Sequence, residues 1–293
     1  MLDLRRLRIL AELRRLGTVT AVADSLHYTH SAVSQQLAAC ERDVGTRLTE
    51  RVGRRLRLTE QGEVLADYAE RMLALADEAS AAVIASTSRV RGTIRVTSFQ
   101  TVLSSLLPAA LTQLALDFPE LTVEVIQHDV EAAAQALARR DVDLILGEEY
   151  PGDVPPTDAT MHREVLLRDP MYLITPETGP WSGLELPDLE GVPFAIDPPN
   201  LAVGRFAQAV CLRHGFAPNF AFQTPDPFLH VHLVRGGHAV SLVPELMLPN
   251  VTGVRVVPLP GNPARTLYTA VNAGREVHPA LVAFRAALAA AAR

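Results

Sequence analysis

From residue 94 onward, short apolar segments typical of β-strands alternate with segments of helical periodicity. The first expected elements are a strand over 94–98, a helix over 101–118, a strand over 121–127, a helix over 130–139 and a strand over 142–146. A second series starts near Met171 and ends in an alanine-rich helix from His278. Such alternation is typical of parallel sheets covered by helices. We therefore expect an α/β fold of two lobes, joined by crossing strands around a ligand-binding cleft.

Length and composition agree with a folded protein of more than one domain. The chain has 293 residues, of which 48% are hydrophobic, and roughly 100 to 200 residues per domain is usual. No apolar segment approaches the roughly 20 residues that span a bilayer, and no leader pattern is seen, so we expect a cytoplasmic protein without a membrane partner. Cys40 and Cys211 are far apart, which predicts buried apolar thiols and no disulfide.

The charge is unevenly distributed along the chain. Residues 1–58 contain eleven arginines and six acidic residues, so this segment carries +5 and the remainder −11 of the net charge of −6. The chain contains no lysine, so its preference for arginine carries no functional meaning. A basic segment attached to an acidic body indicates that one end meets a polyanion, because affinity for nucleic acid phosphates is largely electrostatic.

The basic segment has the pattern of a helix-turn-helix. Apolar spacing predicts a helix over 4–16 that ends at Gly17, a second helix capped by Thr18 or Thr20, and a third from His30 to about Arg42. The third would enter the major groove of double-stranded DNA. Its candidate DNA-binding residues are Thr29, His30, Ser31, Ser34 and Gln35. Taken alone, these polar residues fit equally well on the solvated side of an ordinary amphipathic helix.

A predicted basic hairpin follows the third helix and favours the DNA-binding interpretation. In "RLTERVGRRLRLTEQG" apolar and polar positions alternate on both sides of Gly53. Arg51, Arg54 and Arg55 lie at or beside its tip, where they would reach phosphates or the minor groove. The segment thus predicts a winged helix-turn-helix.

The chain resembles the LysR-type transcriptional regulators along its whole length. The N-terminal resemblance rests on "TVTAVADSLHYTHSAVSQQL" and "ERVGRRLRLTEQG", and the C-terminal one on "LLPAALTQLALDFPELTVEV", "ALARRDVDLIL" and "HLVRGGHAVSLVPE". The N-terminal motifs depart from the family pattern at His30 and Ser31, where Gln-Pro is usual, at Gln35, where Arg is common, and at Thr49, where Phe is usual. The first two departures affect the expected base preference.

The resemblance implies a domain plan and an oligomeric state. It implies a winged helix-turn-helix over 1–58, a linker and dimerisation helix over 59–91, and a periplasmic-binding-protein-like effector domain over 92–293. Its first lobe would comprise about 92–168 and 268–293, and its second about 169–267. An apolar seam in the linker helix, with its alternative of packing on its own domain, supports a homodimer and, by resemblance, a homotetramer: Leu65, Tyr68, Met72, Leu75, Ala79 and Ala82.

The candidate effector-binding residues follow the expected strand ends: Ser98, Phe99, Gln100, Thr101, Glu148, Asp197, Asn200, Thr224 and Asp226. Thr101, at a helix N-terminus, would hold a carboxylate, and the alternative is a simple helix cap. The acidic residues indicate an amine on the ligand, or alternatively are solvated loop charges. An amino acid or small carboxylate is therefore the expected effector.

No sequence motif supports catalysis. A nucleophile elbow, a phosphate-binding loop and a dinucleotide-binding loop are all missing from the sequence. His230 and His232 are two residues apart on an expected helix and do not face one point. We therefore expect neither a metal site, nor a cofactor, nor enzymatic activity. The rival class, a solute-binding or enzymatic α/β protein with an incidental basic N-terminal domain, finds no supporting motif.

Overall fold

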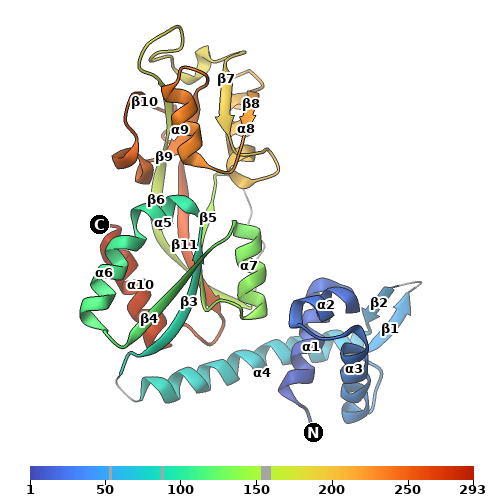
Figure 1. Cartoon of the computed structure of the whole chain (residues 1–293). Coiled ribbons are helices and arrows are strands. Elements are labelled where there is room, and N and C mark those ends of the chain that lie inside the picture. Colours follow the sequence, from blue (N-terminus) through green and yellow to red (C-terminus); the bar gives the residue numbers. More distant parts are fainter. Residues whose placement is uncertain (53–54, 87–88, 153–159) are drawn as a thin grey trace.

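A computed structural model describes residues 1–52, 55–86, 89–152 and 160–293 (Figure 1). The N-terminal domain contains α1 (Leu4–Leu16), α2 (Val19–Leu26), α3 (His30–Val44), β1 (Thr49–Val52) and β2 (Arg55–Leu58), followed by the long helix α4 (Glu60–Ala85). Figure 1 shows α4 leading from this domain to the base of the C-terminal domain.

Side-chain caps set the helix boundaries of the N-terminal domain. Thr18, rather than Thr20, caps α2 by accepting from the Ala21 amide at 3.2 Å, and Thr29 caps α3 in the same way. Gly17 ends α1 at φ 71°, a left-handed conformation that glycine adopts without steric cost. The helices close over a common core: Ile9, Leu10, Leu13, Val19, Val22, Ala23, Val33, Leu37, Cys40, Leu48 and Ala66.

The wing is an antiparallel hairpin in which Arg51 faces Leu56 across the strands. Leu48, just before it, is buried, whereas Val52 is 49% exposed and contributes little to the core. The hairpin joins α4 tightly, because a Cβ at Gly62 would lie 2.1 Å from the Leu48 carbonyl oxygen. Only glycine permits that approach. The tip residue Arg54 lies outside the described residues.

The C-terminal domain alternates strands and helices as expected. In chain order its elements are β3 (Gly92–Ser98), α5 (Gln100–Ser105), α6 (Leu107–Asp117), β4 (Leu121–Gln127), α7 (Val130–Arg139), β5 (Leu144–Glu149), β6 (Met161–Pro176), η1 (Leu186–Asp188), β7 (Pro193–Ile196), α8 (Ala202–Arg213), β8 (Asn219–Gln223), α9 (Pro227–Arg235), β9 (Ser241–Pro244), η2 (Glu245–Asn250), β10 (Val254–Pro258), β11 (Ala264–Asn272) and α10 (Pro279–Ala291).

Two long antiparallel strands, β6 and β11, connect the lobes. The sheet order is β10-β6-β11-β5-β3-β4, with β9 also paired to β6. β3 runs parallel to β4 and β5, which gives the first lobe its parallel part, and a parallel β7–β8 pair lies in the second lobe. Each lobe has its own core, the first around Leu144 and Phe284 and the second around Phe194 and Phe206.

Two sequence expectations within this domain were wrong in extent. The helix expected over 101–118 is divided into α5 and α6 at Leu106, and Pro108 stands in the first turn of the second helix, where its missing N–H costs nothing. The strand expected near Met171 begins at Met161. Its first half alternates charged and apolar residues along a partly solvated edge, which hid the strand in the sequence.

Helix α4 docks on the effector domain of its own chain. Arg140, at the end of α7, donates to both carboxylate oxygens of Asp77 on α4, at 2.7 and 2.5 Å. Arg8 on α1 donates to the Arg139 carbonyl at 2.8 Å. These contacts connect the N-terminal domain to one end of α7.

The apolar seam expected on α4 is largely exposed in the single chain. Tyr68 is 50% exposed, Met72 38% and Leu75 63%, and Ala79 and Ala82 are also exposed, whereas Leu65 is half-buried. A helix with a solvated apolar stripe has not buried all the surface that its sequence offers. Of the described helices, none combines the length and apolar character of a membrane span.

Candidate functional site

The predicted DNA-contacting residues of α3 gather at its N-terminal end. His30, Ser31, Ser34 and Gln35 are all exposed, while Val33 and Leu37 on the other side are buried. Thr29 caps the helix and its hydroxyl lies 3.1 Å from the Ser31 hydroxyl. The helix therefore presents donors and acceptors at its first two turns.

The wing adds positive charge beside α3. Arg51 on β1 and Arg57 on β2 are exposed, and Arg55 occupies the first position of β2. Other arginines of this domain are engaged within the fold: Arg14 pairs with Asp67 and Glu70, which fastens α1 to α4. Exposed guanidinium groups on a hairpin are suited to bind phosphates.

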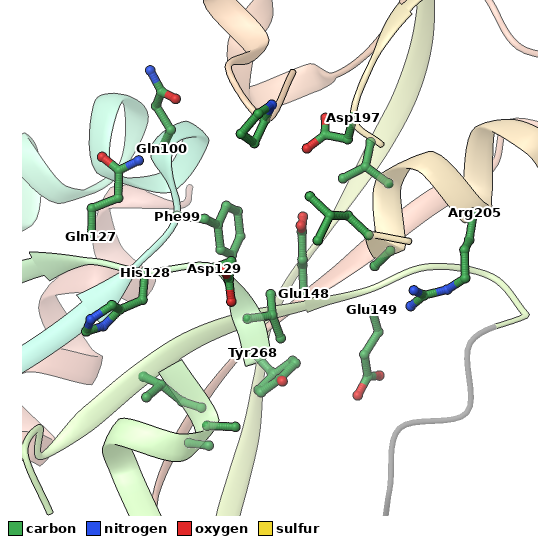
Figure 2. A pocket seen from close by; sticks show the side chains of 18 of the residues that line it. Phe99, Gln100, Gln127, His128, Asp129, Glu148, Glu149, Asp197, Arg205 and Tyr268 are labelled. Atoms are coloured by element: carbon green, nitrogen blue, oxygen red, sulfur yellow. The ribbon is translucent and has the colours of Figure 1, made fainter. Parts of the chain in front are cut away.

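A cavity of about 680 Å³ lies between the two lobes (Figure 2). Of the nine effector-binding candidates, five line it: Phe99, Gln100, Glu148, Asp197 and Asp226. The lining is predominantly apolar, with Phe99, Ile145 and Tyr268 among its members, and carries carboxylates from both lobes. This is the size and character of a small-molecule site.

A buried arginine joins the two lobes behind this cavity. Arg265 on β11 is 2% exposed. Its guanidinium donates to Asp169 at 2.7 and 2.9 Å, to Glu148 at 2.7 Å and to the Thr101 hydroxyl at 3.0 Å. We call Arg265, Asp169, Glu148 and Thr101 the Arg265 cluster. Because β6 and β11 both pass through it, the cluster lies where the lobes meet.

The Arg265 cluster changes the role expected for Thr101. Thr101 is 6% exposed, its hydroxyl accepts from Arg265, and the residue does not line the cavity. Ser98 is buried beside it at 1% exposure. A carboxylate of a ligand would have to displace a buried ion-pair network to reach Thr101, so the structure does not support that contact.

The two remaining candidates serve the local fold of the second lobe. Thr224 accepts from the Asp226 amide through its hydroxyl, and its carbonyl oxygen lies 2.8 Å from His230 Nε2. Asn200 is exposed and its carbonyl accepts from Arg205 at 2.7 Å. Neither residue lines the cavity. Burial lowers the pKa of His230, which fits a structural, neutral imidazole.

Asp197 and Glu148 face each other across the cavity. Asp197 follows β7 in the second lobe and Glu148 belongs to β5 in the first, and Figure 2 shows the Asp197 carboxylate directed toward that of Glu148. Burial and, secondly, the Glu148 charge raise the pKa of Asp197 to about 7. The carboxylate is thus poised between its two protonation states near neutral pH.

Asp226 makes the third acidic contribution, but its carboxylate is occupied. It caps α9 by accepting from the Phe228 and Leu229 amides at 3.0 and 3.3 Å. It also accepts from the Gln100 side chain of the opposite lobe at 3.3 Å. Asp226 therefore bridges the lobes already, unlike Asp197.

Several important residues of the site were not predicted from the sequence. Arg265 and Asp169 are single charged residues within otherwise apolar strand segments, a signal that indicates a buried ion pair but not its partner. Tyr268 lines the cavity opposite Gly147, where a Cβ would lie 2.2 Å from the tyrosine ring. Gly147 therefore leaves the space that this ring occupies.

The cysteines and histidines form no further site in the described part of the chain. Both Cys40 and Cys211 are free and buried, and burial raises the pKa of Cys211 to about 12. Such a thiol is a poor nucleophile, because the thiolate is the reactive form. Across the described ranges, no three His, Cys, Asp or Glu side chains are grouped to hold a metal ion.

Both parts of the chain match known protein families. Residues 4–63 match the bacterial regulatory helix-turn-helix protein of the lysR family, and residues 87–293 match the LysR substrate binding domain. The transcriptional dual regulator GltC of Bacillus subtilis is 27% identical over 262 residues, which cover 88% of this chain and 86% of GltC. A probable RuBisCO transcriptional regulator of Nostoc sp. is 33% identical over 185 residues, 62% of this chain. This chain spans 53% of that relative's length.

Solved structures show the same fold at low sequence identity. Hydrogen-peroxide-bound OxyR from Corynebacterium glutamicum aligns with a TM-score of 0.60 and 20% identity, covering 99% of this chain and 92% of that one. Full-length CbnR in complex with its target DNA aligns with a TM-score of 0.56 and 20% identity, covering all of both chains. These similarities support the arrangement of the domains along the chain.

Proposed function

The chain belongs to the LysR family of bacterial helix-turn-helix proteins, and on this premise we propose that it regulates transcription by binding operator DNA under the control of a small molecule. The observation that carries the proposal is the presence, in one chain, of a capped helix with an exposed polar end and a cavity between two lobes. The relatives named as transcriptional regulators support the same activity.

Sequence-specific binding would depend on the exposed end of α3. Ser34 and Gln35 would meet base edges in the major groove, with His30 and Ser31 beside them. Arg51, Arg54 and Arg55 of the wing would contact phosphates, which position the domain without reading sequence. Because Gln35 stands where Arg is common in the family, the base preference of this chain would be its own.

A homodimer would present two such helices to a two-fold symmetric operator. The exposed stripe of α4, which includes Tyr68, Met72 and Leu75, supports pairing with the same helix of a second chain. Pairing of dimers into a tetramer would follow the family pattern.

Helix α7 offers a route from the cavity to the DNA-binding domain. Its N-terminal end contributes Asp129, Val130 and Ala134 to the cavity lining. Its other end holds Asp77 of α4 through Arg140 and receives the Arg8 bond through the Arg139 carbonyl. A ligand that favours one position of α7 would thereby favour one position of α4, which is the differential contact that allosteric coupling requires.

Selection of binding sites from a random DNA pool by the full chain tests the proposal. We expect an enriched motif of two half-sites, and mobility shifts that weaken as salt rises. Ser34→Ala or Gln35→Ala should relax preference at one or two base pairs, with a cost of about 1–3 kcal/mol. Arg51→Ala should weaken binding to all sequences alike.

The matched control is Arg95→Ala, which removes an exposed arginine of the effector domain that pairs with Glu124. It should leave both affinity and motif unchanged. A pool that yields no motif, or Ser34 and Gln35 variants with the parent's motif, would contradict the proposed role of α3.

A further inference from the structure

We infer that the cavity between the lobes binds an amphipathic primary amine, with its ammonium group between Asp197 and Glu148 and its apolar part against Phe99 and Tyr268. This inference rests on the proposed function, whose ligand it assigns to a chemical class.

The charges around the Arg265 cluster are unbalanced. One guanidinium, that of Arg265, serves three carboxylates, those of Asp169, Glu148 and Asp197. Asp169 is the best satisfied, because it binds two guanidinium nitrogens and also accepts from the Leu246 amide at 3.1 Å. Glu148 shares one oxygen between Arg265 and the Tyr150 hydroxyl. Negative charge in excess of the guanidinium therefore remains at Asp197 and Glu148.

Uncompensated charge in a partly desolvated site is costly unless a counter-charge or a proton supplies the balance. The arginines of the described lining are engaged elsewhere. Arg163 pairs with Glu149, and its guanidinium carbon lies 3.7 Å from the Tyr268 ring centroid. Arg205 donates to the Asn200 carbonyl. An ammonium group on the ligand would supply the missing cation at the point where two carboxylates already face each other.

The shape and polarity of the cavity fit an apolar body attached to that cation. Phe99 and Tyr268 present aromatic rings close to Glu148, as Figure 2 shows, and Ile145, Val130 and Ala134 extend the apolar lining. Aromatic faces also attract cations. A volume of about 680 Å³ is large for a bare metal ion and suits a small organic molecule.

An ammonium in this position would act on both lobes at once. Asp197 and Glu148 belong to different lobes and repel each other when both are ionised. A cation between them converts this repulsion into two attractions, so binding and approach of the lobes are linked. A ligand of the same shape with an anionic group would increase the repulsion.

The proton on Asp197 competes with the amine for the same site. The charged and hydrogen-bonding groups around this site are Glu148 on β5, Asp226 and Gln100 at the lobe contact, Arg205 on α8, and Arg265 through Glu148. Since the pKa of Asp197 is about 7, amine affinity should rise between pH 6 and pH 8 and level off above. Asp197→Asn should remove most of this dependence.

Calorimetric titration of the full chain at pH 8 tests the inference with two matched series of probes. The first is phenethylamine, phenethyl alcohol and hydrocinnamate, and the second is hexylamine, hexanol and hexanoate. We expect each amine to bind roughly 10- to 100-fold more tightly than its alcohol, as a charge-assisted hydrogen bond would give, and the carboxylates to bind most weakly. Asp197→Asn should lower amine affinity by a similar factor and leave alcohol affinity unchanged.

Asp226→Asn is the matched control, because it makes the same change in the same cavity at a carboxylate that already caps α9, and asparagine is also a good cap. It should alter amine affinity by no more than about threefold. Tighter binding of the carboxylates, equal amine affinity in the parent and in Asp197→Asn, or no binding of either amine would overturn the inference. A mobility shift without amine separates the two proposals, because intact DNA binding beside a failed titration would leave the proposed function standing.

Discussion

The DNA-binding domain and the effector domain both use some charged residues to hold the fold together and leave others facing a space that a partner would fill. In the DNA-binding domain, Arg14 joins α1 to α4 through Asp67 and Glu70. Arg51 on the wing is instead exposed to solvent. The first kind of arginine fixes the position of a helix, and the second gives the surface its positive potential.

In the effector domain the signs are reversed and the charges are buried. Arg265 holds Asp169 and Glu148 at the meeting point of the lobes, whereas Asp197 faces the cavity with its pKa raised to about 7. The comparison shows that pairing within the fold, rather than the identity of the residue, separates a structural charge from one directed toward a partner. Four substitutions test this distinction.

The largest effect is expected from Arg265→Met, which keeps much of the side-chain volume but removes the cation. Asp169 and Glu148 would then be buried without their counter-ion, and the free energy of unfolding should fall by about 3–5 kcal/mol. Urea denaturation at pH 8 measures it. Arg95→Met, which breaks the exposed pair with Glu124, should cost less than about 1 kcal/mol. Equal losses in the two variants would contradict a structural role for Arg265.

Asp197→Asn should have the opposite sign. A folded-state pKa raised to about 7 means that the folded chain keeps a proton between about pH 4 and pH 7 that the unfolded chain has released, so parent stability falls as pH rises through this window. The variant lacks that loss and should be more stable than the parent at pH 8 by about 2–4 kcal/mol. At pH 4 the two should be alike. A variant less stable than the parent at pH 8 would show that the Asp197 carboxylate stabilises the fold.

A smaller effect is expected where a paired charge joins the two domains. Asp77→Asn weakens the bidentate contact from Arg140 and should cost about 0.5–1 kcal/mol, because the pair is partly solvated. Hydrogen exchange should rise at the C-terminal end of α7 and in the facing turn of α4. Glu78→Gln, on the same helix, serves as the control, and the same exchange pattern in both variants would argue against the contact.

The smallest effect on stability is expected from Arg51→Ala, because the residue is exposed on the wing. The free energy of unfolding should change by no more than about 0.5 kcal/mol. The salt dependence of DNA binding should nevertheless flatten by about one unit of slope, because one fewer counter-ion is released. An unchanged slope would remove Arg51 from the phosphate-binding surface.

The N-terminal domain was the more predictable region because its determinants are local in the sequence. Helix periodicity, Gly17 as a stop and threonines as caps lie within a few residues of the structure that they specify. The alternation of strands and helices likewise gave the α/β class of the C-terminal domain. The break at Leu106 and the early start of β6 depend on tertiary packing, which the pattern does not contain.

The cavity was predictable only in part, for a reason that Thr101 illustrates. Its position at the start of a helix indicates a polar contact, and that contact exists, but the partner is Arg265, 164 residues away. No spacing rule connects two such residues. Asp197 and Glu148 could be assigned to strand ends, whereas their mutual approach across two lobes required the structure.

Gly274, in the turn between β11 and α10, has a consequence for how this protein can diversify. Its φ is 88°, and a Cβ there would lie 2.0 Å from the Ala74 carbonyl oxygen of α4. Any other residue would both strain the turn and push the helix away. Glycine at this position should therefore recur among those descendants of a common ancestor in which α4 still rests on its own effector domain. Its replacement would identify lineages in which the two domains have separated.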